Sequence, residues 1–369
     1  MDLAFLHPLY EHPGPWASVY VDTSRYAESA PQELSKTGEA LARWLAGQGA
    51  DEPTCRAVRD AVEDLRHSPE PCGRALFARA GTVVLDPPLA TAPGGSSAHW
   101  TPLPHTAPLL ELAAQEPVCV VAYIERRGAE FELRGAVGSR EPGRAGGQQW
   151  PPHRTGTGER PVRHFRLRVE NTWEHNAAEI ADALAVCQEE TRADLVILAG
   201  EGWERRAVRE RLPGRLRTRV IEAPHGVGGR LQDQDVEQIR SEHVRRRADE
   251  ELERFRSARV PDEEGEDRAV EGVPAVVDAA RAHRIDELLL RPDGPDTRRE
   301  VWVGEDPDQL AMRRKDIGAR GERHAWPARA DDALVRSVVE TRAEAVSLMA
   351  AAPDAAPAGG VGALLRREE

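Results

Sequence analysis

The chain has 369 residues, 31% of them charged, and its 63 acidic and 50 basic side chains give a formal net charge of −13. That length predicts two or three domains of about 100–200 residues each, and the negative balance excludes a DNA-binding protein held by a positive field over its whole surface. The longest apolar run, residues 118–124, is far shorter than the roughly 18–20 residues that cross a membrane, which excludes a membrane protein as well.

The first eight residues do not combine a basic stretch with an apolar one, as a secretory signal would, so we expect a cytoplasmic protein. The four cysteines, Cys55, Cys72, Cys119 and Cys187, have no CxxC spacing, and we expect them to be small buried residues rather than a zinc or redox site. The histidines show no H-E-x-x-H arrangement, so we expect neither a metal site nor a cofactor.

The first predicted domain, residues 1–135, is of the α/β type. Alternation of apolar and polar residues predicts a strand over 17–22, and apolar spacing predicts helices over about 31–45 and 52–65. Short β-rich runs then predict further strands, at 74–78, 82–85, 118–123 and 131–134. The last two of these strands are expected to form a hairpin.

The second predicted domain, residues 136–260, begins with a long loop. Residues 136–163 contain six glycines and four prolines and have almost no apolar periodicity. Strands and helices then alternate, which predicts a parallel or mixed sheet with helical cover. The expected strands are 164–169, 195–199 and 219–222, and the expected helices are 176–191, 202–211 and 233–259.

An acidic break at 261–267 predicts a domain boundary, and residues 268–369 predict a small αβα domain. Its expected helices are 272–283 and 330–341, and its expected strands are 287–290, 300–303 and 344–349, followed by an apolar tail at 359–366.

The strongest chemical signal is a concentration of positive charge, which we call the cationic segment (residues 134–168). It holds eight arginines and two acidic residues in a chain that is acidic overall. A run of charges is most often a solvated face, but the glycines, a tryptophan that can stack on a base and two histidines favour contact with RNA. The expected contact residues are Trp150, His153, Arg154, Gly156, Gly158, Arg160, Arg163, His164, Arg166 and Arg168.

A second glycine-rich motif, residues 200–202, follows the buried strand 195–199. It could be a nucleotide-binding turn, but the third glycine of a dinucleotide motif is replaced by Arg205, which favours an ordinary strand-to-helix turn.

Several blocks in order along the chain together resemble the bacterial archaeo-eukaryotic release factor (Pelota-like) family, in particular its actinobacterial branch with Balon-like ribosome hibernation factors. The blocks are Gly14–Asp22, Gly73–Ala78, Trp150–Arg154, Asn176–Ala181 and Gly360–Arg366. The resemblance implies three domains, with a ribonuclease-H-like middle domain and a C-terminal αβα domain resembling kink-turn-binding ribosomal proteins.

In that family a Gly-Gly-Gln tripeptide supports peptidyl-tRNA hydrolysis, and this chain has one at Gly146-Gly147-Gln148. However, the basic run 163–168 resembles the segment that follows the family's catalytic loop, and in that register the matching position is Thr157-Gly158-Glu159. A carboxylate at Glu159 would repel an anionic ester intermediate. Gln148 and Glu159 are therefore the two candidate catalytic residues, and neither is assigned.

The resemblance implies a ribosome-associated factor that occupies the A site, from the decoding centre to the peptidyl-transferase centre, and promotes hibernation under stress without hydrolysis. The implied partners are the 70S ribosome, through its rRNA, and elongation factor Tu, with neither membrane nor DNA involved. One alternative is a peptidyl-tRNA hydrolase that acts in ribosome rescue. Another is a soluble metabolic or stress enzyme with a nucleotide at residues 200–202.

Overall fold

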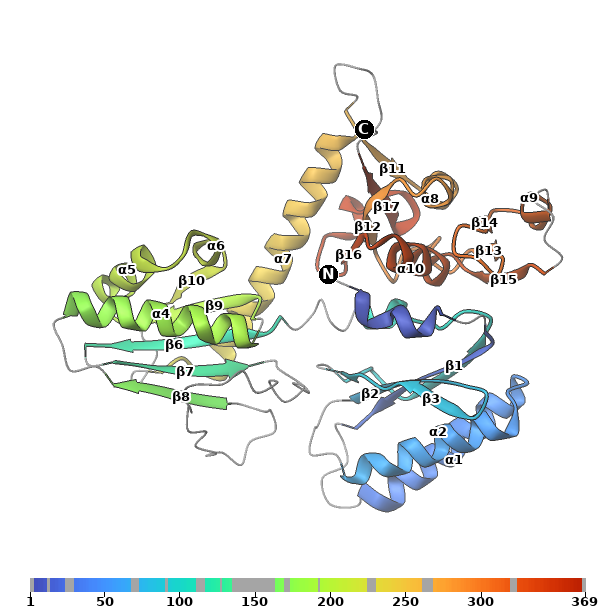
Figure 1. Cartoon of the computed structure of the whole chain (residues 1–369), viewed down its shortest axis with the longest axis horizontal. Coiled ribbons are helices and arrows are strands. Elements are labelled where there is room, and N and C mark those ends of the chain that lie inside the picture. The colour runs from blue at the N-terminus through green and yellow to red at the C-terminus, as the bar shows by residue number, and fades with distance from the viewer. Residues whose placement is uncertain are drawn as a thin grey trace. The chain divides into compact units, whose positions relative to one another are not determined.

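The computed structural model (Figure 1) describes the following residues: 3–11, 14–23, 30–67, 73–89, 92–110, 117–126, 128–134, 163–168, 173–191, 193–223, 230–260, 268–318 and 324–366. The chain divides into two compact units. Unit 1 combines Met1–Gln115 with Val244–Glu369, and unit 2 is Glu116–His243. Among the described helices, none has the length and apolar character needed to cross a membrane.

The N-terminal half of unit 1 is an antiparallel sheet packed on two helices, with strand order β3-β2-β1-β5 and β4 beside β2. Strand β1 (Trp16–Asp22) alternates between two cores: Ala17, Val19 and Val21 pack under the helices, whereas Trp16 and Tyr20 face the opposite side. The remaining elements are η1 (Ala4–Leu9), α1 (Ala30–Gly47), α2 (Glu52–Asp64), η2 (Leu65–His67), β2 (Gly73–Arg79), β3 (Thr82–Leu85), β4 (Pro88–Leu89) and β5 (Ser97–Thr101).

The C-terminal half of unit 1 contains a four-stranded sheet of order β11-β17-β12-β16 and a three-stranded sheet of order β14-β13-β15. Helices α8 and α10 pack on one face of the larger sheet, and the second half of α7 packs on the other. The elements are α7 (Asp233–Ala258), β11 (Ala269–Glu271), α8 (Val273–Arg281), β12 (Ile285–Leu290), β13 (Glu300–Val303), β14 (Leu310–Ala311), α9 (Arg314–Gly318), β15 (Trp326–Arg329), α10 (Ala330–Thr341), β16 (Glu344–Ser347), η4 (Pro353–Ala355), η5 (Ala358–Gly360) and β17 (Val361–Leu365).

A single buried cluster joins the two halves of unit 1. Leu6, Leu9 and Trp16 from the N-terminal half share this cluster with Leu334 and Val338 of α10. Burying apolar area contributes roughly 25 cal/mol per Å², so a continuous cluster of this kind holds the two halves together. Sequence periodicity predicts each helix and strand here separately but does not show that the halves share one core.

Unit 2 is a mixed five-stranded sheet of order β10-β9-β6-β7-β8, in which β6, β9 and β10 are parallel and β7 pairs antiparallel with both β6 and β8. Helices α4, α5 and α6 cover one face, and Leu231 with the start of α7 covers the other. The elements are β6 (Cys119–Glu125), β7 (Gly128–Arg134), β8 (Arg163–Arg168), α4 (Trp173–Thr191), β9 (Leu195–Ala199), α5 (Gly202–Arg211), α6 (Gly214–Arg217) and β10 (Val220–Ala223). The prediction of a mixed α/β protein is confirmed.

The strand pairing groups some segments differently from the predicted domains 1–135, 136–260 and 268–369. The hairpin of β6 and β7 is present as expected, but β6 also pairs in parallel with β9, so the hairpin belongs to unit 2 and not with the segments before it. The last part of α7, from Ala248 to Phe255, packs in unit 1. Both differences arise from contacts distant in sequence, which local patterns do not encode.

Two of the three described cysteines, Cys55 and Cys119, are buried as predicted, and Cys187 is half-buried. Cys72 lies outside the described residues.

Candidate nucleic-acid interface

The cationic segment begins at the last residue of β7 and includes β8, and these two strands fix where the chain between them leaves the sheet. Their last paired positions are Leu133 and Arg163, so the chain departs from β7 at Arg134 and re-enters the sheet at Arg163. Strand β8 stands at the end of the strand order, and it carries Arg163, His164, Arg166 and Arg168. The other predicted site residues lie outside the described residues: Gln148, Trp150, His153, Arg154, Gly156, Gly158, Glu159 and Arg160.

The register between β7 and β8 puts basic positions beside acidic ones. His164 is opposite Glu132, and Arg166 is opposite Glu130. The backbone register therefore gives the base of the segment two positions where a basic residue stands opposite an acidic one.

The positive charge of Arg134 is neutralised by acidic side chains within unit 2. Its guanidinium forms ion pairs with Glu132 and with Asp233 at the start of α7, the latter at 2.5 Å between Nη1 and Oδ1, and its side chain is 16% exposed. Burial opposes the charge, but Glu132 and Asp233 outweigh burial and raise the pKa of Arg134 above its ordinary value. The unpaired positive charge of the segment must therefore come from its other arginines.

A second arginine on this face of the sheet was not foreseen. Arg230 contacts Glu130 at 2.6 Å and Glu132 at 3.7 Å, and its guanidinium lies 5.1 Å from the centre of the Tyr123 ring. Burial, followed by the charge of Glu132, raises the pKa of Tyr123 to about 12. The only sequence signal for this network is the pair of glutamates at alternate positions of β7, whose side chains share one face of the strand.

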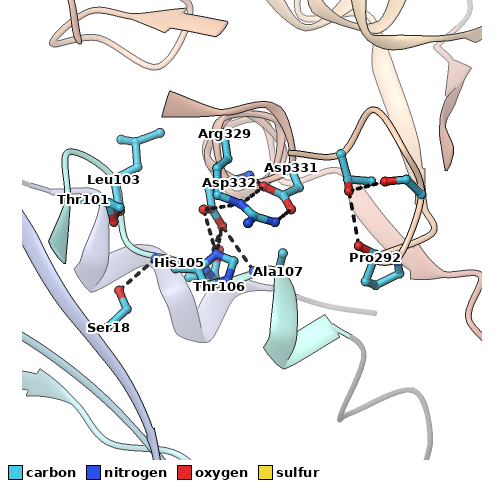
Figure 2. Close-up of polar contacts among 12 residues, drawn as sticks. Ser18, Thr101, Leu103, His105, Thr106, Ala107, Pro292, Arg329, Asp331 and Asp332 are labelled. Atoms are coloured by element: carbon cyan, nitrogen blue, oxygen red, sulfur yellow. Dashed lines mark hydrogen bonds and ion pairs between the residues drawn. The ribbon is translucent and has the colours of Figure 1, made fainter. Parts of the chain in front are cut away.

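Unit 1 holds a separate buried polar cluster around Asp332 in the first turn of α10 (Figure 2). The His105 ring donates from Nδ1 to Asp332 Oδ2 at 2.9 Å, and the backbone N–H groups of Thr106 and Ala107 donate to Asp332 Oδ1 at 2.9 and 3.3 Å. Carboxylates at a helix N-terminus also interact favourably with the helix dipole. The cluster thus ties residues 105–107 to α10.

Burial and neighbouring charges together shift the pKa values of the histidines and of Asp331 in this cluster. Burial lowers the pKa of His105, but Asp332 outweighs burial through its charge and hydrogen bond, so the pKa of His105 is raised overall. Burial and the adjacent Asp332 raise the pKa of Asp331, although Arg329 forms an ion pair with it. Burial, followed by the nearby His105, lowers the pKa of His99 to about 4.

The His105–Asp332 pair is arranged as a structural clamp. Ser18 is the nearby hydroxyl that a nucleophilic mechanism would need, but its Oγ accepts from the backbone N–H of His105 at 2.9 Å, and among the described residues no hydrogen bond joins it to the imidazole ring. Tyr20 donates from its hydroxyl to the carbonyl oxygen of His105 at 2.6 Å. Both groups hold the backbone of His105 and so orient its ring toward Asp332.

The glycine motif at residues 200–202 connects β9 to α5. A Cβ on Gly200 would lie 2.8 Å from the carbonyl oxygen of Ile124, so close approach of two backbones requires glycine there. Packing therefore accounts for this glycine without a bound nucleotide. Within the described ranges, no group of three or more histidine, cysteine, aspartate or glutamate side chains could hold a metal ion.

Residues 118–260 match the model of the family described as bacterial archaeo-eukaryotic release factor family 2. The matched range contains all five strands of unit 2 and the whole of α7. Two curated relatives are the uncharacterized proteins Rv2629 and MT2704 from two strains of Mycobacterium tuberculosis, each 27% identical over 357 residues, 96% of this chain and 93% of the relative. These findings support a release-factor-like family.

Three solved structures are also similar. Saccharomyces cerevisiae Dom34, a translation termination-like factor, has a TM-score of 0.42 and 10% identity, covering 83% of this chain and 77% of Dom34. Archaeal Pelota, in a ribosome-bound model with ABCE1, has a TM-score of 0.38 and 13% identity, covering 98% of this chain and 93% of that Pelota chain. Archaeoglobus fulgidus Pelota has a TM-score of 0.28 and 16% identity, covering 80% of this chain and 79% of that Pelota chain. At these TM-scores the likeness to solved structures carries no argument about function.

Proposed function

We propose that this chain is a ribosome-associated factor that occupies the A site and promotes hibernation under stress without hydrolysing peptidyl-tRNA. The observation that carries the proposal is the match of residues 118–260 to a release factor family, because the cationic segment lies within that range. In this proposal the segment enters an rRNA cavity, and the first domain faces the decoding centre.

The charge of the segment supports contact with rRNA. With Arg134 neutralised by Glu132 and Asp233, seven arginines remain against two acidic residues. Each arginine that neutralises a phosphate releases counterions, which gives RNA affinity and makes it dependent on salt. Trp150 adds a surface for stacking on a base, and glycines let the backbone pass close to RNA.

The absence of hydrolysis follows from the proposed register. If β8 corresponds to the basic segment that follows the family's catalytic loop, then Gly158 and Glu159 take the positions of the last two residues of the family's Gly-Gly-Gln tripeptide. A glutamate there cannot stabilise a developing oxyanion as a neutral hydrogen-bond donor does. The segment would then occupy the cavity through shape and charge.

The three-domain architecture and elongation factor Tu belong to the same proposal. The sheet of unit 2 is proposed to be ribonuclease-H-like, and the C-terminal sheet with α8 and α10 to resemble kink-turn-binding ribosomal proteins. Elongation factor Tu is proposed as the protein that delivers the chain to the ribosome.

Co-sedimentation of the full chain with vacant 70S ribosomes, with and without elongation factor Tu, tests this proposal. We expect binding that weakens with salt. The double variant R154Q/R160Q should lower the magnitude of the slope of log affinity against log salt by about 1.5, because each phosphate contact contributes roughly 0.7–0.9. The matched control R43Q/R56Q removes two exposed arginines from α1 and α2 and should leave the slope unchanged. Failure to bind ribosomes under either condition would exclude the proposal.

The alternative, a peptidyl-tRNA hydrolase in ribosome rescue, is favoured by one observation, the tripeptide Gly146-Gly147-Gln148. This function predicts release of the nascent peptide from stalled ribosomes, and Q148A should abolish the release. Release that persists in Q148A would show that Gln148 is not catalytic.

A further inference from the structure

Unit 1 contains a cavity of about 170 Å³ where its two halves meet. Most of the lining is apolar. From the N-terminal half it includes Leu9, Tyr10, Trp16 and a run of three residues, Pro102–Pro104, and from the C-terminal half Val303, Gly304, Trp326 and Arg336. Because one buried cluster holds the two halves together, the walls of the cavity are fixed relative to each other.

Arg336 is the one charged side chain among the residues that line this cavity. It is 4% exposed, and it donates hydrogen bonds to the carbonyl oxygens of Gly304, at 2.9 Å, and of Glu305. Both partners are neutral, and within the described part of the chain no carboxylate forms an ion pair with it. An arginine stays charged in proteins, and a buried charge without a counter-charge is costly.

The electrostatic environment of Arg336 agrees with this geometry. Burial lowers the pKa of Arg336 below its usual value, even though Tyr10, Asp306 and Glu340 act in the opposite direction. A guanidinium has five N–H groups, of which two are used by the backbone carbonyls. The residue can therefore bind an anion that enters the cavity.

The size and aromatic lining of the cavity restrict what that anion can be. A cavity of about 150 Å³ is large enough to bind benzene. Trp16, Trp326 and Tyr10 supply aromatic surface, and the Tyr10 hydroxyl is already hydrogen-bonded to Thr106 Oγ1 at 3.1 Å. A single aromatic ring fits the space and the lining, and a carboxylate on that ring matches the fork of the guanidinium.

We propose that this cavity is a binding site for a small aromatic monocarboxylate, with the ring against Trp16 and Trp326 and the carboxylate on Arg336. The site is independent of the cationic segment, and its test does not depend on ribosome binding.

Titration of the full chain, labelled with ¹⁵N at tryptophan, tests the site with sodium benzoate as the probe. Of the eight tryptophan indole N–H signals, those of Trp16 and Trp326 should shift, with the Trp326 signal identified as the one missing from W326F. Benzamide has the same shape without the charge and should bind at least tenfold more weakly. This comparison uses the unaltered protein and needs no variant to fold.

Two variants then test the role of the charge. R336Q should weaken benzoate binding at least tenfold, whereas R336K, which keeps the charge, should retain most of it. The matched control R43Q removes an exposed arginine that does not line the cavity and should bind benzoate as the unaltered chain does. Equal affinity for benzoate and benzamide, or shifts confined to tryptophans outside the cavity, would overturn the proposal.

Discussion

Ion-pair geometry decides what individual charged residues contribute. Arg134 lies inside the most basic stretch of the sequence, but two carboxylates neutralise it. Arg336 has no special sequence context, but it is buried beside neutral carbonyls in the wall of a cavity. The sequence predicts which stretch is basic. Which of its charges are free depends on partners far along the chain, such as Asp233.

We predict that R134Q and R154Q differ in their effect on ribosome binding. R154Q should lower the magnitude of the slope of log affinity against log salt by the roughly 0.7–0.9 that one phosphate contact contributes. R134Q should leave this slope nearly unchanged, because Arg134 is already paired. R134Q should instead destabilise unit 2 by about 1–3 kcal/mol, since Glu132, which is 2% exposed, loses one of its two arginines. Sedimentation across a salt series and urea unfolding measure the two effects. Equal salt slopes for the two variants would contradict the assignment.

The His105–Asp332 clamp predicts a dependence on pH. Because the pKa of His105 is raised in the folded chain, its stabilisation is complete below the unfolded value of about 6.5 and is lost as the pH rises through the folded value. H105N should therefore weaken the protection of the Thr106 and Ala107 amides by about 2 kcal/mol at pH 6, and by less at pH 9.

Hydrogen exchange of residues 102–110, compared with the unaltered chain at each pH, measures this effect. The control H7N changes an exposed histidine of η1 that takes no part in the clamp. A loss of protection that is the same at both pH values would show that the charge of His105 does not contribute.

At the scale of single elements, sequence patterns placed some elements at the observed bounds, both where nearly every residue is buried, as in β9 and α10, and where burial alternates, as in β13. The predictions for 195–199, 300–303 and 330–341 are confirmed by β9, β13 and α10 with the same bounds. Helix ends were less well placed: α4 begins at Trp173 and not at about 176, because end residues carry little of the apolar period. No periodicity signals the clamp, which joins a loop to a helix.

The turn between β9 and α5 predicts a contrast between two glycines. G200A should destabilise unit 2 by about 2 kcal/mol or more, because its Cβ would meet the Ile124 carbonyl oxygen at 2.8 Å and its φ is +157°. G202A is the matched control, since its nearest neighbour would be the end of the Arg205 side chain at 3.8 Å. Thermal unfolding of both variants measures the contrast, and equal destabilisation would contradict the packing explanation.

At the scale of the whole molecule, chain length predicted several domains and the alternation of expected strands and helices predicted an α/β protein, whereas the observed strand pairing shows which segments belong to each unit. The parallel pairing of β6 with β9 and the division of α7 between two units depend on contacts between distant segments. The base of the candidate interface lies on β7 and β8, and residues 135–162 lie outside the described residues. Their role stays a prediction from charge and resemblance.

A cryo-EM map of the full chain bound to vacant 70S ribosomes tests the central claim most directly. We predict density for the chain in the A site, with residues 135–162 extending from the β7–β8 edge into the rRNA of the peptidyl-transferase centre. A chain bound elsewhere on the ribosome, or a cationic segment that contacts only its own protein, would contradict the account.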